Sequence, residues 1–283
     1  MMKKKEKFIL IIFILVTLIA GFLGVLVDQI LTEQPEGSSL GMLVWLVLPL
    51  ITGLIGRGVL KEWKSFGIKL KFRENIRWLC ISLFAFPIIT LICIFIALCF
   101  RGIYFEKVVV ATIPGLFLGA AIGSGIKNIF EEFSWRGNLV PFLEKTGMND
   151  FVLYLVSGFI WGGWHVAYYL FFLEDSYFVD ITRPQMVITG IVIMILWSPL
   201  FVELYRLTHS VWPCVILHTM IDVIPTLLFT TAQMIHLDKH LDFMLNPTSG
   251  VIPILLTLGL GLWLRKKRCE KIYSSRPKEK SCF

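Results

Sequence analysis

The chain has 283 residues, of which 56% are hydrophobic and only 17% are charged. A soluble domain carries about 25% charged residues, so this composition excludes an ordinary soluble domain. The net charge of +7 would suggest a nucleic-acid partner in a soluble protein, but the basic residues lie mostly in loops and no nucleic-acid motif accompanies them, so we expect no nucleic-acid binding.

Long apolar segments predict an all-α, polytopic transmembrane bundle of about eight spans. Several of these segments exceed the roughly 18 apolar residues that mark a transmembrane helix. The first follows a basic N-terminus, but no small-x-small cleavage site comes after it, so we interpret it as a retained helix. In chain order, the predicted spans are Phe8–Val27, Leu40–Leu60, Trp78–Phe100, Val108–Phe130, Phe151–Leu173, Met186–Leu204, Val211–Thr230 and Val251–Leu264.

The loops between these segments alternate between basic and acidic or weakly charged composition. The N-terminus, the loop Lys61–Arg77 and the C-terminal Arg265–Arg268 are basic, whereas the first loop carries acidic residues and no basic one. The positive-inside rule therefore places both termini in the cytoplasm, a parity that eight spans satisfy. We expect a multi-pass protein of a bacterial plasma membrane.

Two adjacent carboxylates, Glu131 and Glu132, end the fourth apolar run, and Arg136 follows. Charged side chains beside hydrocarbon are costly and usually functional. If the helix continues past Phe130, Glu132 and Arg136 are i,i+4 neighbours that can form an ion pair. Glu131 then points about 100° away and is left free for chemistry. The alternative is that both glutamates simply end a helix at the water interface.

Histidines in two later spans supply further candidates. His165 lies inside the fifth span, where Gly158 and Gly162 allow a neighbouring helix to approach closely. In the seventh span His218 and Asp222 share one helix face, so that the carboxylate can orient the imidazole. In each case the alternative is a buried histidine that hydrogen bonds a neighbouring group and has no further role.

Two other polar pairs are weaker candidates. Glu203 and Arg206, at the end of the sixth span, are expected to form an interfacial pair whose charged ends reach water. His236 and His240 have the i,i+4 spacing of helical metal ligands but lack the accompanying glutamate, so we favour a solvated loop there.

Three short motifs, in this order on successive late spans, resemble those of the CPBP family, the CAAX-protease and bacteriocin-processing (Abi) group of intramembrane endopeptidases. The resemblance covers roughly residues 108–229. The second motif usually has Phe and the last often has Asn, and an Asn donates a hydrogen bond whereas an ionised Asp only accepts. Here the motifs read Glu131-Glu132-x-x-x-Arg136, Trp161-x-x-x-His165 and His218-x-x-x-Asp222.

The resemblance implies hydrolysis of a peptide bond in a membrane-embedded or lipidated protein or peptide. The charges of the loops predict that the site opens toward the cytoplasm. Glu131 would activate a water, His165 would hold or deprotonate that water, and His218 would stabilise the oxyanion. Asp222 would orient His218. We expect no cofactor, although a zinc-dependent version would use Glu131, His165 and His218 as ligands and leave one position for water.

The chain is accordingly divided into three parts. Residues 1–107 are expected to form N-terminal transmembrane helices with a basic cytoplasmic loop. Residues 108–230 form the catalytic core, in which Glu132 takes part through its ion pair, and residues 231–283 form the last transmembrane helix with a basic tail. A non-catalytic scaffold or bacteriocin-immunity protein would keep this fold without the chemistry. A proton- or ion-coupled transporter would also use intramembrane carboxylates and histidines, but the sequence has no convincing inverted repeat.

Overall fold

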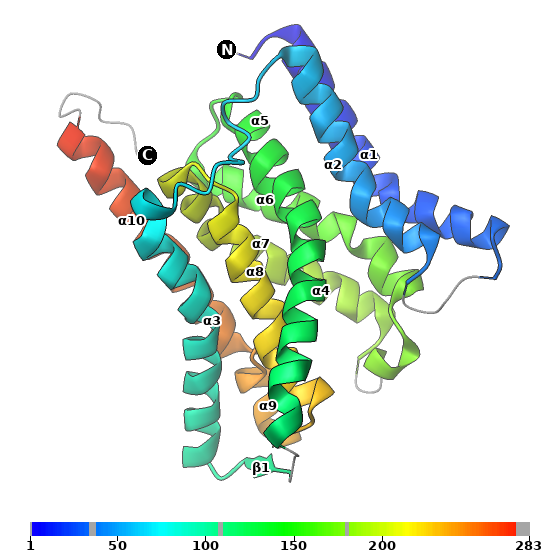
Figure 1. Cartoon of the computed structure of the whole chain (residues 1–283), viewed down its shortest axis with the longest axis vertical. Coiled ribbons are helices and arrows are strands. Elements are labelled where there is room, and N and C mark those ends of the chain that lie inside the picture. The colour runs from blue at the N-terminus through cyan, green and yellow to red at the C-terminus, as the bar shows by residue number, and fades with distance from the viewer. Residues whose placement is uncertain (1, 34–37, 107–109, 179–180, 276–283) are drawn as a thin grey trace.

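The computed structural model describes residues 2–33, 38–106, 110–178 and 181–275, which form an α-helical bundle with one short β-ribbon (Figure 1). The ribbon pairs β1 (Ile103–Phe105) antiparallel with β2 (Ile235–Leu237). Three π-helical turns, Trp135–Leu139, Tyr168–Phe172 and Thr226–Thr231, lie beyond the ends of α4, α6 and α8. The helices are α1 (Lys4–Ile30), α2 (Leu40–Leu60), α3 (Phe72–Cys99), α4 (Ile113–Ser134), α5 (Val140–Glu144), α6 (Asp150–Trp164), α7 (Arg183–Thr208), α8 (Trp212–Pro225), α9 (Lys239–Leu245) and α10 (Val251–Ser275).

Seven helical stretches in the described part of the chain are long and apolar enough to cross a membrane, against about eight predicted from the sequence. The difference lies in α10, where every 18-residue window includes the four basic residues Arg265–Arg268. α10 nevertheless packs along α7, and Figure 1 shows its last turns at the same end of the molecule as the start of α1. The side of the membrane on which each terminus lies stays a prediction.

The helix that carries Glu131 continues past Phe130, as one interpretation of the sequence required. α4 leads into the π-helical turn Trp135–Leu139 and then into α5. The first half of α4 lies largely on the outside of the bundle, whereas every residue from Glu131 to Leu143 is buried. π-helical turns inside α-helices are frequent at functional sites. The two carboxylates therefore enter the core and do not end the helix in water.

A buried arginine supports this π-helical turn. Arg57 lies in the last turn of α2 and is fully buried. Its guanidinium donates to Asn138 Oδ1 at 2.7 Å and to the carbonyl oxygen of Gly137. Gly53, one turn earlier on α2, makes room for this contact, because a Cβ there would lie 2.5 Å from the amide of Asn138. α2 and the site helix are thus held together by polar contacts inside the core.

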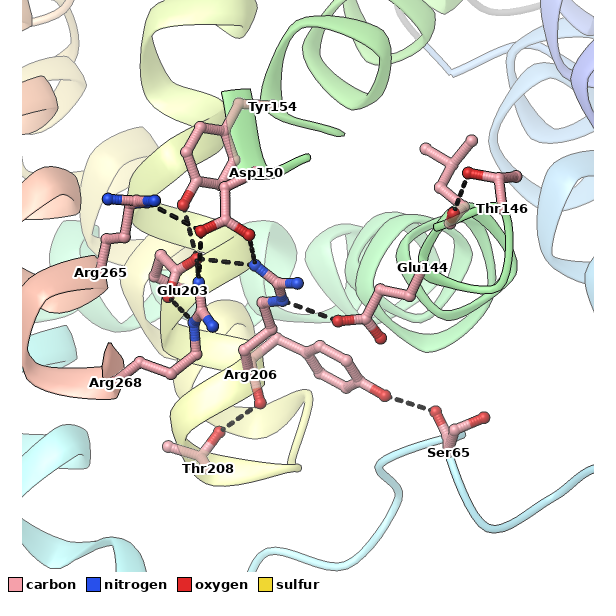
Figure 2. Close-up of polar contacts among 12 residues, drawn as sticks. Ser65, Glu144, Thr146, Asp150, Tyr154, Glu203, Arg206, Thr208, Arg265 and Arg268 are labelled. Atoms are coloured by element: carbon pink, nitrogen blue, oxygen red, sulfur yellow. Dashed lines mark hydrogen bonds and ion pairs between the residues drawn. The ribbon is translucent and has the colours of Figure 1, made fainter. Parts of the chain in front are cut away.

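Glu203 and Arg206 do not form the isolated interfacial pair expected from the sequence. Glu203 is fully buried and accepts hydrogen bonds from Tyr154 (2.5 Å), Arg206 (3.0 Å) and Arg268 (2.6 Å). Asp150, the first residue of α6, accepts from Arg206 at 2.8 Å and from Arg268 at 2.7 Å (Figure 2). This network ties the basic half of α10 to α6 and α7.

The close helix approach predicted at Gly158 and Gly162 is present, and the neighbour is α7. A Cβ at Gly162 would lie 2.7 Å from Ile191 Cα, and one at Gly158 would meet Ile195 Cα even more closely. Both clashes are with backbone atoms, which cannot move aside as a side-chain end can. α6 is therefore fixed against α7 along the stretch that leads to His165.

Gly158→Ala is expected to destabilise the fold by about 1–3 kcal/mol, because overpacking forces the two helices apart. Gly119→Ala on α4 is the matched control, since a Cβ there meets no atom within 4 Å. Thermal unfolding in detergent measures both. Equal midpoints for the two variants would contradict the importance of this contact.

Candidate active site

Three helices bring the predicted site residues to one place. Glu131 lies in the last turns of α4, His165 is the C-cap of α6, and His218 lies in the middle of α8. Their exposed fractions are only 1%, 8% and 4%. Titratable side chains this deeply buried need specific partners, so the contacts of each decide what it can do.

Trp161 contacts all three of these residues. Its indole Nε1 donates to Glu131 Oε2 at 3.3 Å. Its ring centroid lies 6.4 Å from that of His165 and 5.4 Å from that of His218. The indole N–H is a donor that a phenylalanine at this position would lack. The tryptophan therefore joins the carboxylate to both imidazoles, which sequence spacing alone did not reveal.

Glu131 keeps one oxygen atom without a hydrogen bond. Oε2 accepts from Trp161, and Oε1 lies 3.4 Å from Lys127 Nζ in an ion pair. Oε1 is buried and, within the described residues, accepts no hydrogen bond. It can therefore accept one from a small molecule such as water.

Glu132 forms the predicted ion pair with Arg136 and also binds a histidine. Its Oε1 lies 2.9 Å from Arg136 Nη1 and 2.8 Å from His218 Nδ1. The guanidinium packs against the rings of Trp161 and Phe201, with its carbon 4.3 and 4.2 Å from their centroids. The ion pair thus has a second task, which is to fix the orientation of His218.

Asp222, which was expected to orient His218, makes no direct hydrogen bond with it. The closest approach between them, from Oδ1 to Nε2, is 3.9 Å, which is too long for a hydrogen bond. The other oxygen of Asp222 instead binds two residues of α4, Lys127 Nζ at 3.0 Å and Asn128 Nδ2 at 2.9 Å. Neither was singled out from the sequence, although Lys127 stands four residues before Glu131, a spacing that signals a helical ion pair.

His165 is held by one hydrogen bond and a group of aromatic rings. Its Nδ1 lies 2.9 Å from the carbonyl oxygen of Trp161, and its ring stacks on Tyr169 with centroids 5.6 Å apart. Trp164 and Trp45 contact it edge-on, and these two tryptophans stack at 3.9 Å and exchange N–H···O=C hydrogen bonds. Trp45 of α2 was missed in the sequence because it lies over a hundred residues away.

The zinc alternative finds no support in the geometry. Across the residues that the structure describes, no three His, Cys, Asp or Glu side chains are arranged to hold a metal ion. His236 and His240 do not share a helix, because the first lies in β2 and the second in α9, so their spacing is not that of helical ligands. That Glu131, His165 and His218 together bind zinc stays a prediction.

A comparison with protein families finds one match over the part of the chain that carries the site. Residues 114–224 match the model of the type II CAAX prenyl endopeptidase Rce1-like family. The matched segment runs from the start of α4 through nearly all of α8, so it contains the three motifs. No curated protein matches the chain. With the site and the match at the same residues, the chain carries a domain of the Rce1-like type II CAAX prenyl endopeptidase family, a family of peptidases.

Proposed function

We propose that this protein is an intramembrane endopeptidase in which Glu131 activates water to hydrolyse a peptide bond of a membrane-associated protein or peptide. The observation that carries the proposal is the buried Oε1 of Glu131, which accepts no hydrogen bond within the described chain while Trp161 holds the other oxygen. A buried carboxylate with one acceptor position unused is suited to remove a proton from a bound water.

The hydrogen bonds of the two histidines favour different tasks for them. His165 Nδ1 faces a carbonyl oxygen, which only accepts, so Nδ1 carries the proton and the neutral ring leaves Nε2 as an acceptor. That tautomer suits holding or deprotonating the water. His218 Nδ1 instead faces the carboxylate of Glu132, which favours a doubly protonated ring whose Nε2 is a donor. That form suits an oxyanion.

The charges of the site agree with a doubly protonated His218. Three carboxylates, Glu131, Glu132 and Asp222, then face three cations, Lys127, Arg136 and His218, through the contacts described above. A balanced group costs far less in a low-dielectric environment than one with an uncompensated charge.

The reaction then proceeds in two balanced steps. Glu131 takes a proton from the water, the hydroxide attacks the peptide carbonyl carbon, and His218 Nε2–H stabilises the oxyanion. When the tetrahedral intermediate collapses, the C–N bond breaks and Glu131 returns its proton to the leaving nitrogen. The products are a new carboxylate end and a new amine end. The basic loop Lys61–Arg77 and the basic start of α1 lie at the end of the bundle where α4 meets α5 (Figure 1). Because basic loops usually face the cytoplasm, they support a site that opens toward that side.

The test compares membrane peptides from cells that express the chain with those from cells that express Glu131→Gln. New peptide N-termini should be present only with the unchanged chain, and they identify the substrate. If a folded Glu131→Gln variant gives the same peptides and the same cellular phenotype, the chain is not this peptidase, and a non-catalytic membrane scaffold or immunity protein is the better description.

Chelation tests the metal-free form of the mechanism. Because the proposed steps use only protein groups, dialysis against EDTA followed by 1,10-phenanthroline should leave at least roughly half of the activity, a change within about twofold that corresponds to less than one kcal/mol. Loss of activity that added zinc restores would contradict the metal-free steps and favour the zinc alternative.

A further inference from the structure

Lys127 lies between two carboxylates at the edge of the candidate site. It stands one helical turn before Glu131 on α4, and its Nζ is 3.4 Å from Glu131 Oε1 and 3.0 Å from Asp222 Oδ2. Its side chain is 39% exposed, whereas that of Asp222 is 24% exposed and that of Glu131 is 1% exposed. A single cation thus connects the buried end of α4 with α8.

Asp222 is fixed to α4 from two sides. Asn128, which is fully buried, donates to the same oxygen that Lys127 binds, at 2.9 Å. Asn128 Nδ2 also lies 3.5 Å from Thr219 Oγ1, one turn earlier on α8. The consecutive residues Lys127 and Asn128 therefore hold α8 in register with the helix that carries Glu131.

The charge of Asp222 needs this cation. A carboxylate whose cation is removed repels other carboxylates nearby, and this repulsion is strong where water is scarce. Lys127 pairs with Asp222 and Glu131 at once, so it offsets the repulsion between them. It also leaves Asp222 Oδ1 on the side of His218, 3.9 Å from Nε2, where a negative charge favours the doubly protonated ring.

We propose that Lys127 is a positioning residue of the peptidase, which acts through Glu131 and Asp222 and not on the substrate. The inference rests on the proposed function. It assigns Lys127 and Asp222 to one charge-balanced unit, so that each is harmful without the other. A lysine that merely forms a surface ion pair would contribute little, and its removal would not depend on residue 222.

The experiment uses four full-length variants, Lys127→Met, Lys127→Arg, Asp222→Asn and the double variant Lys127→Met/Asp222→Asn. The probe is a total membrane extract from cells that lack the protein, and the rate of formation of new peptide N-termini is measured by mass spectrometry. Lys127→Met should be slower by about tenfold, and Lys127→Arg should stay within about threefold of the unchanged chain, since coupled neighbours interact by amounts of this order.

The decisive comparison is the effect of Asp222→Asn in two backgrounds. In the chain that keeps Lys127, Asp222→Asn should slow the reaction, because the positive charge of Lys127 is then paired with Glu131 alone. In the Lys127→Met background it should speed the reaction, because it removes the carboxylate that has lost its cation. Independent, additive losses, or a Lys127→Met variant as fast as the unchanged chain, would overturn the inference.

Two controls distinguish a failure of the Lys127–Asp222 unit from misfolding and from a failure of the proposed peptidase function. Thermal unfolding midpoints are measured for every variant, and if Lys127→Met does not fold, Lys127→Gln takes its place in the same comparison. Glu131→Gln is measured in parallel. If Glu131→Gln is as fast as the unchanged chain, the proposed peptidase fails; if it is inactive and the Lys127 and Asp222 effects are additive, only the unit of Lys127 and Asp222 fails.

Discussion

Glu131→Gln is expected to lower the rate of peptide cleavage by about 10²- to 10⁴-fold, the usual contribution of a general base. The amide keeps the shape of the carboxylate, and its oxygen can still accept from Trp161 Nε1, so the fold should be retained. What is lost is the ability to remove a proton from water. The measurement is the rate of formation of new N-termini in a membrane extract, together with the unfolding midpoint.

Glu106→Gln is the matched control for this substitution. Glu106 carries the same side chain, but it is 67% exposed and lies at the β-ribbon, remote in sequence from the motifs. The cleavage rate of Glu106→Gln should equal that of the unchanged chain, which would show that loss of one negative charge does not by itself lower the rate. A Glu131→Gln variant with full activity would remove Glu131 from the role of base, and a more severe loss in Glu132→Gln alone would transfer that role to its neighbour.

Features that depend only on residue spacing along one helix were the part of the site that the sequence could predict. The pairing of Glu132 with Arg136 follows from helical spacing, and it is present at 2.9 Å. The close helix approach at Gly158 and Gly162 follows from the absence of side chains, and it too is present. Spacing within a helix is nearly independent of the rest of the fold, so these predictions needed no tertiary information.

Contacts between helices were not predictable in the same way. The carboxylate that orients His218 was expected on its own helix, at Asp222, but the carboxylate that hydrogen bonds its Nδ1 is that of Glu132, which lies 86 positions away in the chain. Which of the two carboxylates faces the imidazole depends on the rotation of α4 against α8. Such rotations are set by packing of whole helices, and residue spacing along one helix carries no information about them.

The end of the chain shows the same limit for charged residues. The basic group Arg265–Arg268 was assigned to a cytoplasmic tail because positive charges usually follow a span. In the structure Arg268 continues α10 and donates to the buried Glu203 at 2.6 Å (Figure 2). Charge alone could not separate a solvated tail from a helix end that neutralises a buried acid.

Glu132→Ala is expected to reduce stability and activity together, unlike Glu131→Gln. Removal of the Glu132 carboxylate leaves the buried Arg136 without its ion-pair partner and His218 Nδ1 without an acceptor. Breaking one side of a buried ion pair typically costs about 3–5 kcal/mol. The unfolding midpoint in detergent should therefore fall well below that of Glu131→Gln, and cleavage should be lost even at temperatures where the variant is folded.

The double variant Glu132→Gln/Arg136→Met separates the two tasks of Glu132. Replacing both partners removes the uncompensated charge, and a methionine can pack against the rings of Trp161 and Phe201 that the guanidinium contacts in the unchanged chain. Stability should return toward that of the unchanged chain. Activity should not return, because a neutral amide no longer favours the doubly protonated His218. A Glu132→Ala variant that folds normally and cleaves at full rate would show that the pair is dispensable, and a double variant with restored cleavage would show that Glu132 serves the fold alone.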